Sequence, residues 1–212
     1  MARRKDHTRE QLHEMAIQAA ATVLEKEGPE VITARRIARE IGYAPGTLYN
    51  VFADLEELML HVAGRALDDL RSDLVAARQR AAGAAGDATV AMVMALARTQ
   101  LDFMRRRPAA WWQLFHVGWP DDRLFPKWYI AKISAAMAEL EAALLPEFET
   151  DDLFRERLAR TLWAGFFGIC EVAALRQLMI VPADDIEGMT RYMVEACINQ
   201  ARTDLNARER RT

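Results

Sequence analysis

The chain of 212 residues is long enough to bury a substantial core, either as one medium domain or as a small domain joined to a larger one. Its 51% of apolar and 28% of charged residues are typical of a folded globular protein, and its longest apolar stretch, residues 88–97, is too short to cross a bilayer, which argues against disorder and a membrane span. The formal net charge is −3, so a nucleic-acid partner would require positive charge that is concentrated locally.

Most of the chain is rich in Ala, Leu, Met, Glu, Arg and Gln, with apolar residues spaced three and four positions apart. This pattern predicts an all-α fold of about nine helices, because no segment alternates with the two-residue period of a strand. The first helix is expected over Thr8–Lys26, with Gly28 as its C-terminal cap.

Two short helices are expected next. Thr33 is a suitable N-cap for a helix that ends at Ile41, and Pro45 is suited to the first turn of the following helix. The tight turn between them contains Gly42, and this spacing is typical of a helix-turn-helix. We therefore predict a three-helix, helix-turn-helix DNA-binding domain over residues 1–53.

Residues 54–212 are predicted to form a larger helical bundle. Asp54 is expected to cap its first helix, and the paired acids at 121–122, 151–152 and 184–185 are interpreted as caps of later helices rather than as a catalytic dyad. The expected helices cover approximately residues 54–77, 87–106, 108–117, 122–144, 151–179 and 184–207.

The segment Gly46–Asn50 contains short and polar residues where a purely structural helix would favour Ala, Leu or Glu. Gly46 permits a close approach of the backbone to DNA, and Thr47, Tyr49 and Asn50 supply hydrogen-bonding groups. Arg35 is within the preceding helix and is a candidate for contact with a guanine. The alternative is that the arginines of this helix form an ordinary solvated face.

Residues 32–52 resemble the DNA-binding signature of TetR-family regulators, and the resemblance extends over roughly the first 60 residues. It implies a homodimer whose two recognition helices enter successive major grooves of a palindromic double-stranded operator, usually to repress transcription. By this resemblance, phosphates are contacted by Thr33, Tyr43 and Tyr49, bases or the groove floor by Arg35, Pro45, Gly46, Thr47 and Asn50, and the DNA backbone by a basic arm of Arg3, Arg4 and Lys5.

The sequence departs from the family pattern at three positions. The family commonly has an aromatic or His residue in place of Val51 and a Lys in place of Leu55, and both would help to hold phosphate. Residues 162–169 resemble a C-terminal pattern of one subgroup, but Phe167 stands where His is expected. These departures predict weaker contact with the DNA backbone and the loss of one polar contact to a ligand.

Aromatic residues are concentrated between residues 103 and 129, either as a plain core or as the lining of a cavity. The family resemblance favours a pocket for a small apolar or aromatic effector, in which His116 is either a ligand contact or a structural residue. The expected lining is Phe103, Trp111, Trp112, Phe115, His116, Trp128, Trp163, Phe166 and Phe167.

The last two helices have small and apolar residues at helical spacing, which suits a four-helix interface between two copies of the chain. The alternative is that these residues only close the core of one copy. Because a palindromic operator has two half-sites, a homodimer is favoured, with an interface of Gly168, Val172, Leu175, Met189, Met193 and Cys197.

No catalytic residue, metal site or cofactor is predicted. The four histidines are scattered, the only cysteines are Cys170 and Cys197, and no nucleophile motif or phosphate-binding loop occurs. The polar N-terminus is not followed by a secretion signal, so a cytoplasmic location without membrane contact is expected. Two alternatives to a ligand-responsive repressor stay open: an activator or ligand-independent regulator, and a helical binding protein or enzyme with a vestigial helix-turn-helix.

Overall fold

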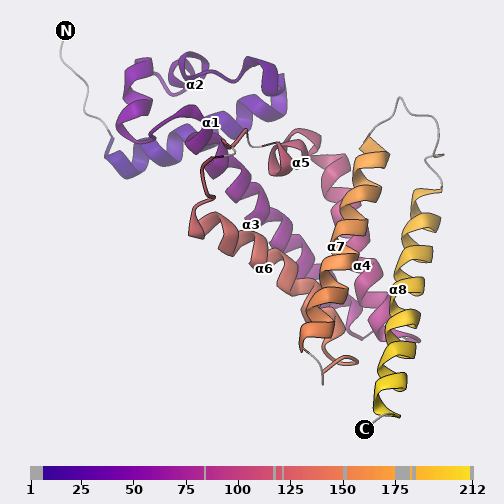
Figure 1. Cartoon of the computed structure of the whole chain (residues 1–212). Coiled ribbons are helices and arrows are strands. Elements are labelled where there is room, and N and C mark those ends of the chain that lie inside the picture. Colours follow the sequence, from indigo (N-terminus) through magenta and orange to yellow (C-terminus); the bar gives the residue numbers. More distant parts are fainter. Residues whose placement is uncertain are drawn as a thin grey trace. The chain divides into compact units, whose positions relative to one another are not determined.

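The computed structural model describes residues 7–210 except 84, 117, 121, 150–151, 175–181 and 183–184, and the regular structure of these residues is entirely helical (Figure 1). The predicted all-α fold is thereby confirmed. In chain order the elements are α1 (Arg9–Glu27), η1 (Pro29–Val31), α2 (Ala34–Glu40), η2 (Pro45–Asn50), α3 (Leu55–Ala81), α4 (Ala88–Arg106), α5 (Pro108–Phe115), α6 (Lys127–Leu144), α7 (Asp152–Ala174) and α8 (Ile186–Glu209), where η denotes a 3₁₀ helix.

The chain divides into two compact units. Unit 1 consists of residues 1–68 and 106–132, and unit 2 consists of residues 69–105 and 133–212. Unit 1 therefore contains the whole of the N-terminal domain expected from the sequence, together with the first half of α3, α5 and the start of α6. Within the described residues, each helix is too short or too polar to span a membrane.

The core of unit 1 is formed by α1, α2, η2 and the start of α3. The hydroxyl of Thr8 accepts a hydrogen bond from the Gln11 amide, and the Gln11 side chain accepts one from the Thr8 amide, which fixes the start of α1. Gly28 ends α1 with a φ of 86°, a conformation that disfavours side chains. The buried side chains include Ala16, Ile17, Ala20, Leu24, Ile37, Ala38, Leu48, Phe52 and Leu58.

The structure tests the helix caps that the sequence predicts at Asp54 and Asp122. Asp54 accepts a hydrogen bond from the Glu57 amide at 2.7 Å and thereby caps α3, as predicted. The helix expected to begin at Asp122 begins instead at Lys127, so the interpretation of Asp122 as a cap is wrong. The reason is Pro126, which excludes the preceding residue from the helical region, and whose carbonyl accepts the first bonds of α6.

The other two acidic pairs lie closer to their helices. Asp152 is the first residue of α7, and Asp185 precedes α8 without capping it through its side chain. Asp121, Asp151 and Asp184 lie outside the described residues.

In unit 2, α7 and α8 lie side by side and run in opposite directions (Figure 1). A Cβ atom on Gly165 would collide with the Met193 sulfur, so glycine at this position of α7 leaves room for the Met193 side chain of α8. The thiol of Cys170 is buried, and burial raises its pKa to about 12. Cys170 is therefore a packing residue, and Cys197 is half-buried.

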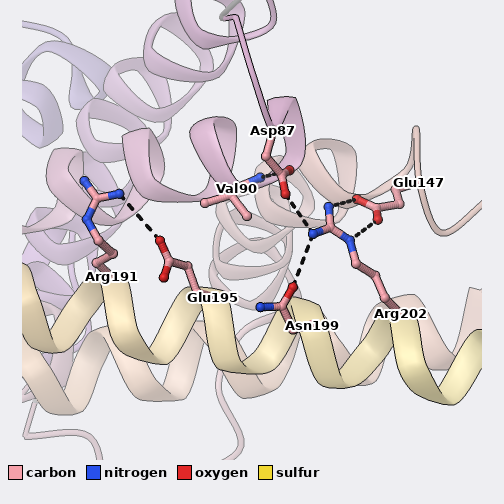
Figure 2. Close-up of polar contacts among 7 residues, drawn as sticks. All are labelled: Asp87, Val90, Glu147, Arg191, Glu195, Asn199 and Arg202. Atoms are coloured by element: carbon pink, nitrogen blue, oxygen red, sulfur yellow. Dashed lines mark hydrogen bonds and ion pairs between the residues drawn. The ribbon is translucent and has the colours of Figure 1, made fainter.

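A cluster around Arg202 joins three parts of unit 2 (Figure 2). The Arg202 guanidinium on α8 donates to Asp87 Oδ2 at 2.7 Å and to both carboxylate oxygens of Glu147, one of them at 2.9 Å. Asp87 also accepts from the Val90 amide at 3.0 Å and so caps α4. Hydrogen bonds from Arg202 lower the pKa of both carboxyl groups. The cluster therefore fixes the start of α4 and the end of the α6 region against α8.

Candidate nucleic-acid interface

Helix α2 presents three arginines with different surroundings. Thr33 is exposed and caps the helix by accepting a hydrogen bond from the Arg36 amide at 3.1 Å. Arg36 donates to Glu27 and, at 2.6 Å, to Glu40, and these bonds raise its pKa further above the ordinary value. Arg35 and Arg39 are exposed, and neither forms an ion pair within the described part of the chain. Of the three arginines, only Arg36 is therefore engaged in ion pairs within the described part of the chain.

The turn between α2 and η2 depends on Gly42, whose φ of 78° lies in the region that favours glycine. The amide of Tyr43 donates to the Ala38 carbonyl at 2.9 Å, which closes the turn. The Tyr43 hydroxyl lies 2.6 Å from His7 Nδ1. The predicted phosphate contact of Tyr43 would therefore involve a hydroxyl that is already hydrogen-bonded within the protein.

The recognition segment, residues 45–50, is the 3₁₀ helix η2 rather than the α-helix expected from the sequence. Its Leu48 side chain is buried, as is Phe52 just beyond it, and the amides of Val51 and Phe52 both donate to the Leu48 carbonyl. Pro45 occupies the first turn, where its missing N–H costs nothing. Buried anchors thus hold the segment against α1 and α2 from one side.

The opposite side of the recognition segment faces away from the core. Tyr49 is 56% exposed, Asn50 and Gly46 are exposed, and Thr47 is half-buried. A Cβ atom at Gly46 would meet nothing within 4 Å, and its φ is not positive. Neither backbone conformation nor packing within the described chain therefore requires glycine at this position.

The two N-terminal departures from the family pattern have a packing explanation that the sequence reasoning missed. Val51 belongs to the buried core of unit 1, and Leu55 is half-buried against the same core. Apolar residues at both positions therefore contribute to burial behind the recognition segment. The signal available in the sequence was their spacing from Leu48 and Leu58.

The residues predicted to line an effector pocket are divided between the two units. Five of them belong to unit 1: three in α5, His116 directly after α5, and Trp128 in α6. The other four belong to unit 2 and are Phe103, Trp163, Phe166 and Phe167. Phe103, Trp111 and Phe166 are buried, whereas Trp112 is 40% exposed and stacks on the exposed His116 with centroids 4.7 Å apart. A common effector pocket for these residues stays a prediction.

An open groove of about 900 Å³ in unit 1 was not anticipated from the sequence. It is lined by residues of α1 and by the end of α2, including Glu10, Glu14, Glu40, Met15 and Ile41. Its carboxylates distinguish it from the apolar pocket that the sequence predicted. The lining residues become neighbours only when α1 and α2 pack together, so no local sequence motif predicts the groove.

The predicted dimer residues differ in their exposure. Gly168 is exposed, and a Cβ atom added there would meet nothing within 4 Å, whereas Met193 contacts Gly165 of the same chain. Val172, Met189 and Cys197 are half-buried, and Tyr192 on α8 is 78% exposed. Leu175 and the basic arm of Arg3, Arg4 and Lys5 lie outside the described residues. The homodimer interface therefore stays a prediction.

A metal centre has no evident place in the described part of the chain. There, no group of three or more His, Cys, Asp or Glu side chains is arranged to hold a metal ion.

The N-terminal segment is similar to a known protein family. Residues 16–62 match the sequence model of bacterial regulatory proteins of the TetR family. This match covers the helix-turn-helix and the start of α3. No match was found among curated proteins.

Solved structures extend the similarity over nearly the whole fold. A protein of unknown function from Rhodococcus sp. RHA1 is 21% identical, with a TM-score of 0.66 and coverage of 91% of this chain and 97% of that chain. A TetR-family transcriptional regulator from Streptomyces coelicolor is 16% identical, with a TM-score of 0.67 and coverage of 95% and 88%. The multidrug-binding protein EbrR, solved with imidazole, is 20% identical, with a TM-score of 0.60 and coverage of 91% and 96%.

Proposed function

We propose that this chain is a ligand-responsive transcriptional repressor of the TetR family, because residues 16–62 match the model of that family and a TetR-family regulator has a similar fold. In this proposal a homodimer binds a palindromic operator, and a small apolar or aromatic effector releases it. The protein then acts in the cytoplasm, where it contacts double-stranded DNA. The proposal assigns the chain no catalytic step and no cofactor.

The observation that supports operator binding most strongly is that residues 45–52 combine buried apolar anchors with exposed polar or small residues. Leu48 and Phe52 anchor the segment, while Gly46, Tyr49 and Asn50 are exposed and polar or small. Asn can bond an adenine edge at two atoms, Tyr can reach a phosphate, and glycine permits a close approach to the backbone. Arg35 and Arg39 add positive charge on the neighbouring helix.

Dimerisation is supported by the exposed small residues of α7. Ala164 and Gly168 are exposed and one helical turn apart, so a second helix can approach the backbone closely at this face. An operator with two half-sites requires two recognition segments about 34 Å apart, which one copy of the chain does not supply. We therefore retain the homodimer as part of the proposal.

An apolar effector is supported by the aromatic content of α5 and α7. The description of EbrR as a multidrug-binding protein, crystallised with imidazole, shows that a protein of similar fold holds a small aromatic molecule. In this chain the effector would bind among the predicted pocket residues and favour a conformation whose recognition segments no longer match successive grooves.

The experiment that tests the proposal is selection of operator sequences from random duplex DNA by the purified protein, repeated across salt concentrations. We expect an enriched palindrome and an affinity that falls steeply with salt. Tyr49→Ala is expected to abolish enrichment, and Trp112→Ala, which is exposed on α5, serves as the matched aromatic control that leaves enrichment intact. Weak, sequence-independent retention at low salt would contradict the proposal and favour a helical binding protein or enzyme with a vestigial helix-turn-helix.

A further inference from the structure

Four aromatic side chains from separate parts of unit 1 form a continuous column, which we call the ring column. Phe52 stacks on His13 of α1 with centroids 4.5 Å apart and an interplanar angle of 22°. His13 meets the edge of His61 of α3 at 4.6 Å and 84°, and His61 stacks on Trp128 of α6 at 4.5 Å and 15°. The column therefore joins three helices to the residue that anchors the recognition segment.

The two ends of the ring column are closely packed. Phe52 is buried, and its amide donates to the Leu48 carbonyl at 2.9 Å, so the residue at this end of the column is tied directly to η2. At the other end, a Cβ atom on Gly64 would come within 2.8 Å of the Trp128 ring. Glycine at this position of α3 thus permits the approach of Trp128 to the helix.

The column places two titratable imidazoles in contact. Both are half-buried, and a proton on His61 lies beside the ring of His13. Burial is the main factor that lowers the pKa of His61, followed by the nearby His13, and Lys132 of α6 acts in the same direction. The ring face of Trp128 attracts an imidazolium, but the net direction for His61 is downward.

The charged groups around the column are mostly committed to other partners. Glu57, one turn before His61, opposes the lowering of its pKa, and its carboxylate accepts a hydrogen bond from the Ala53 amide. Arg65 of α3 pairs with Glu14 of α1, and Lys132 pairs with Asp68. An imidazolium in the column therefore lacks a dedicated carboxylate among the described groups that face it.

We propose that His13 and His61 are positioning residues that hold the recognition segment through Phe52, and that proton uptake by His61 weakens operator binding. This inference rests on the proposed function, because operator binding is the property that it regulates. It adds a response to acidification that is separate from the response to an effector.

The direction of the effect follows from proton linkage. Because the folded-state pKa of His61 is lowered, the unfolded chain binds more protons than the folded unit below the ordinary histidine pKa of about 6.5. The stability of unit 1 therefore decreases as the pH falls from about 6.5 towards the folded-state pKa, and it is unaffected by this group at higher pH. Operator affinity is expected to fall in the same window.

The test is to measure operator affinity between pH 8 and pH 5 for the full chain and for variants that retain a ring but cannot bind a proton. We expect the wild-type affinity to fall by roughly threefold to tenfold over this range, within the tenfold per pH unit that one linked proton permits. His13→Phe and His61→Phe are each expected to bind at pH 8 like the wild type and to reduce this pH dependence. His116→Phe is the matched control, because His116 also stacks on a tryptophan but is exposed.

A second measurement keeps the test decisive if a phenylalanine variant folds poorly. The histidine ring protons of the wild-type protein are followed by NMR through the same pH range, and we expect the titration of His61 to coincide with movement of the Phe52 ring signals. The inference would be overturned if both phenylalanine variants kept the wild-type pH dependence of operator affinity, or if the Phe52 ring signals did not change as His61 titrates. Either result would leave the proposed function intact. Failure to bind any operator at pH 8 would overturn the proposed function and this inference with it.

Discussion

The recognition segment and the Arg202 cluster differ in how their polar side chains are used. Around Arg202, each charged group is paired, and the pairs join α4, α8 and the residues after α6 within unit 2. In the recognition segment, the exposed polar groups of Tyr49 and Asn50 have no such intramolecular role among the described residues. Polar residues of the first kind contribute to stability, whereas those of the second kind are explained by a partner outside the chain.

The same contrast occurs within a single turn of η2, and it gives the largest expected effect on stability. Leu48→Ala removes a buried side chain from the core of unit 1, so the free energy of unfolding should fall by about 2–4 kcal/mol. Chemical denaturation measures this loss. A decrease below about 1 kcal/mol would show that Leu48 does not anchor the segment.

Asn50→Ala tests the exposed side of that turn. Loss of a bidentate contact to a base should cost about 1–3 kcal/mol of binding free energy, while stability changes by less than about 0.5 kcal/mol. The operator selected by the wild type serves as the probe in a fluorescence titration. If the variant binds the operator as tightly as the wild type, Asn50 does not contribute to the interface with DNA.

Arg35 and Arg36 are adjacent, and they allow the comparison to be made between identical side chains. Arg35→Ala should weaken operator binding by about 1 kcal/mol and reduce its salt dependence or its preference at one base pair. Arg36→Ala should lower the Tm through the loss of its bonds to Glu27 and Glu40, with base preference unchanged. The reverse assignment of the two effects would contradict the interface as described.

The smallest of these effects is expected in the Arg202 cluster, because its groups are partly exposed. Arg202→Ala should lower the free energy of unfolding by about 1 kcal/mol at neutral pH. The pKa values of Asp87 and Glu147 are lowered in the folded state, so this contribution is full above their ordinary values of about 4 and is lost as the pH falls through the folded values. Denaturation of wild type and variant at pH 7 and pH 3 measures the difference, which should shrink in acid.

The sequence predicted those parts of the fold that depend on local patterns. The turn at Gly42, the caps at Thr33 and Asp54 and the helical nature of the described chain follow from propensities and short motifs. The start of α6 differs from the sequence prediction because Pro126, and not the acidic pair at 121–122, determines where the helix begins. Local signals compete, and the proline constraint is the stronger one.

The remaining features of the site depend on contacts between distant residues. The histidines look scattered along the chain, yet folding brings His13 and His61 into contact. Val51 and Leu55 looked like lost phosphate contacts until their burial was visible. The aromatic residues that were grouped into one pocket belong to both units, because sequence density does not distinguish neighbouring helix faces.

Gly46→Ala tests the central claim that the exposed side of residues 45–50 is shaped for a partner rather than for stability. The substitution meets no atom within 4 Å and no positive φ, so the free energy of unfolding should stay constant or rise by up to about 1 kcal/mol. Operator affinity, measured on the same preparation, should fall by about tenfold because the added methyl group keeps the backbone from the DNA. A variant that is equally stable and binds the operator as tightly as the wild type would contradict the claim.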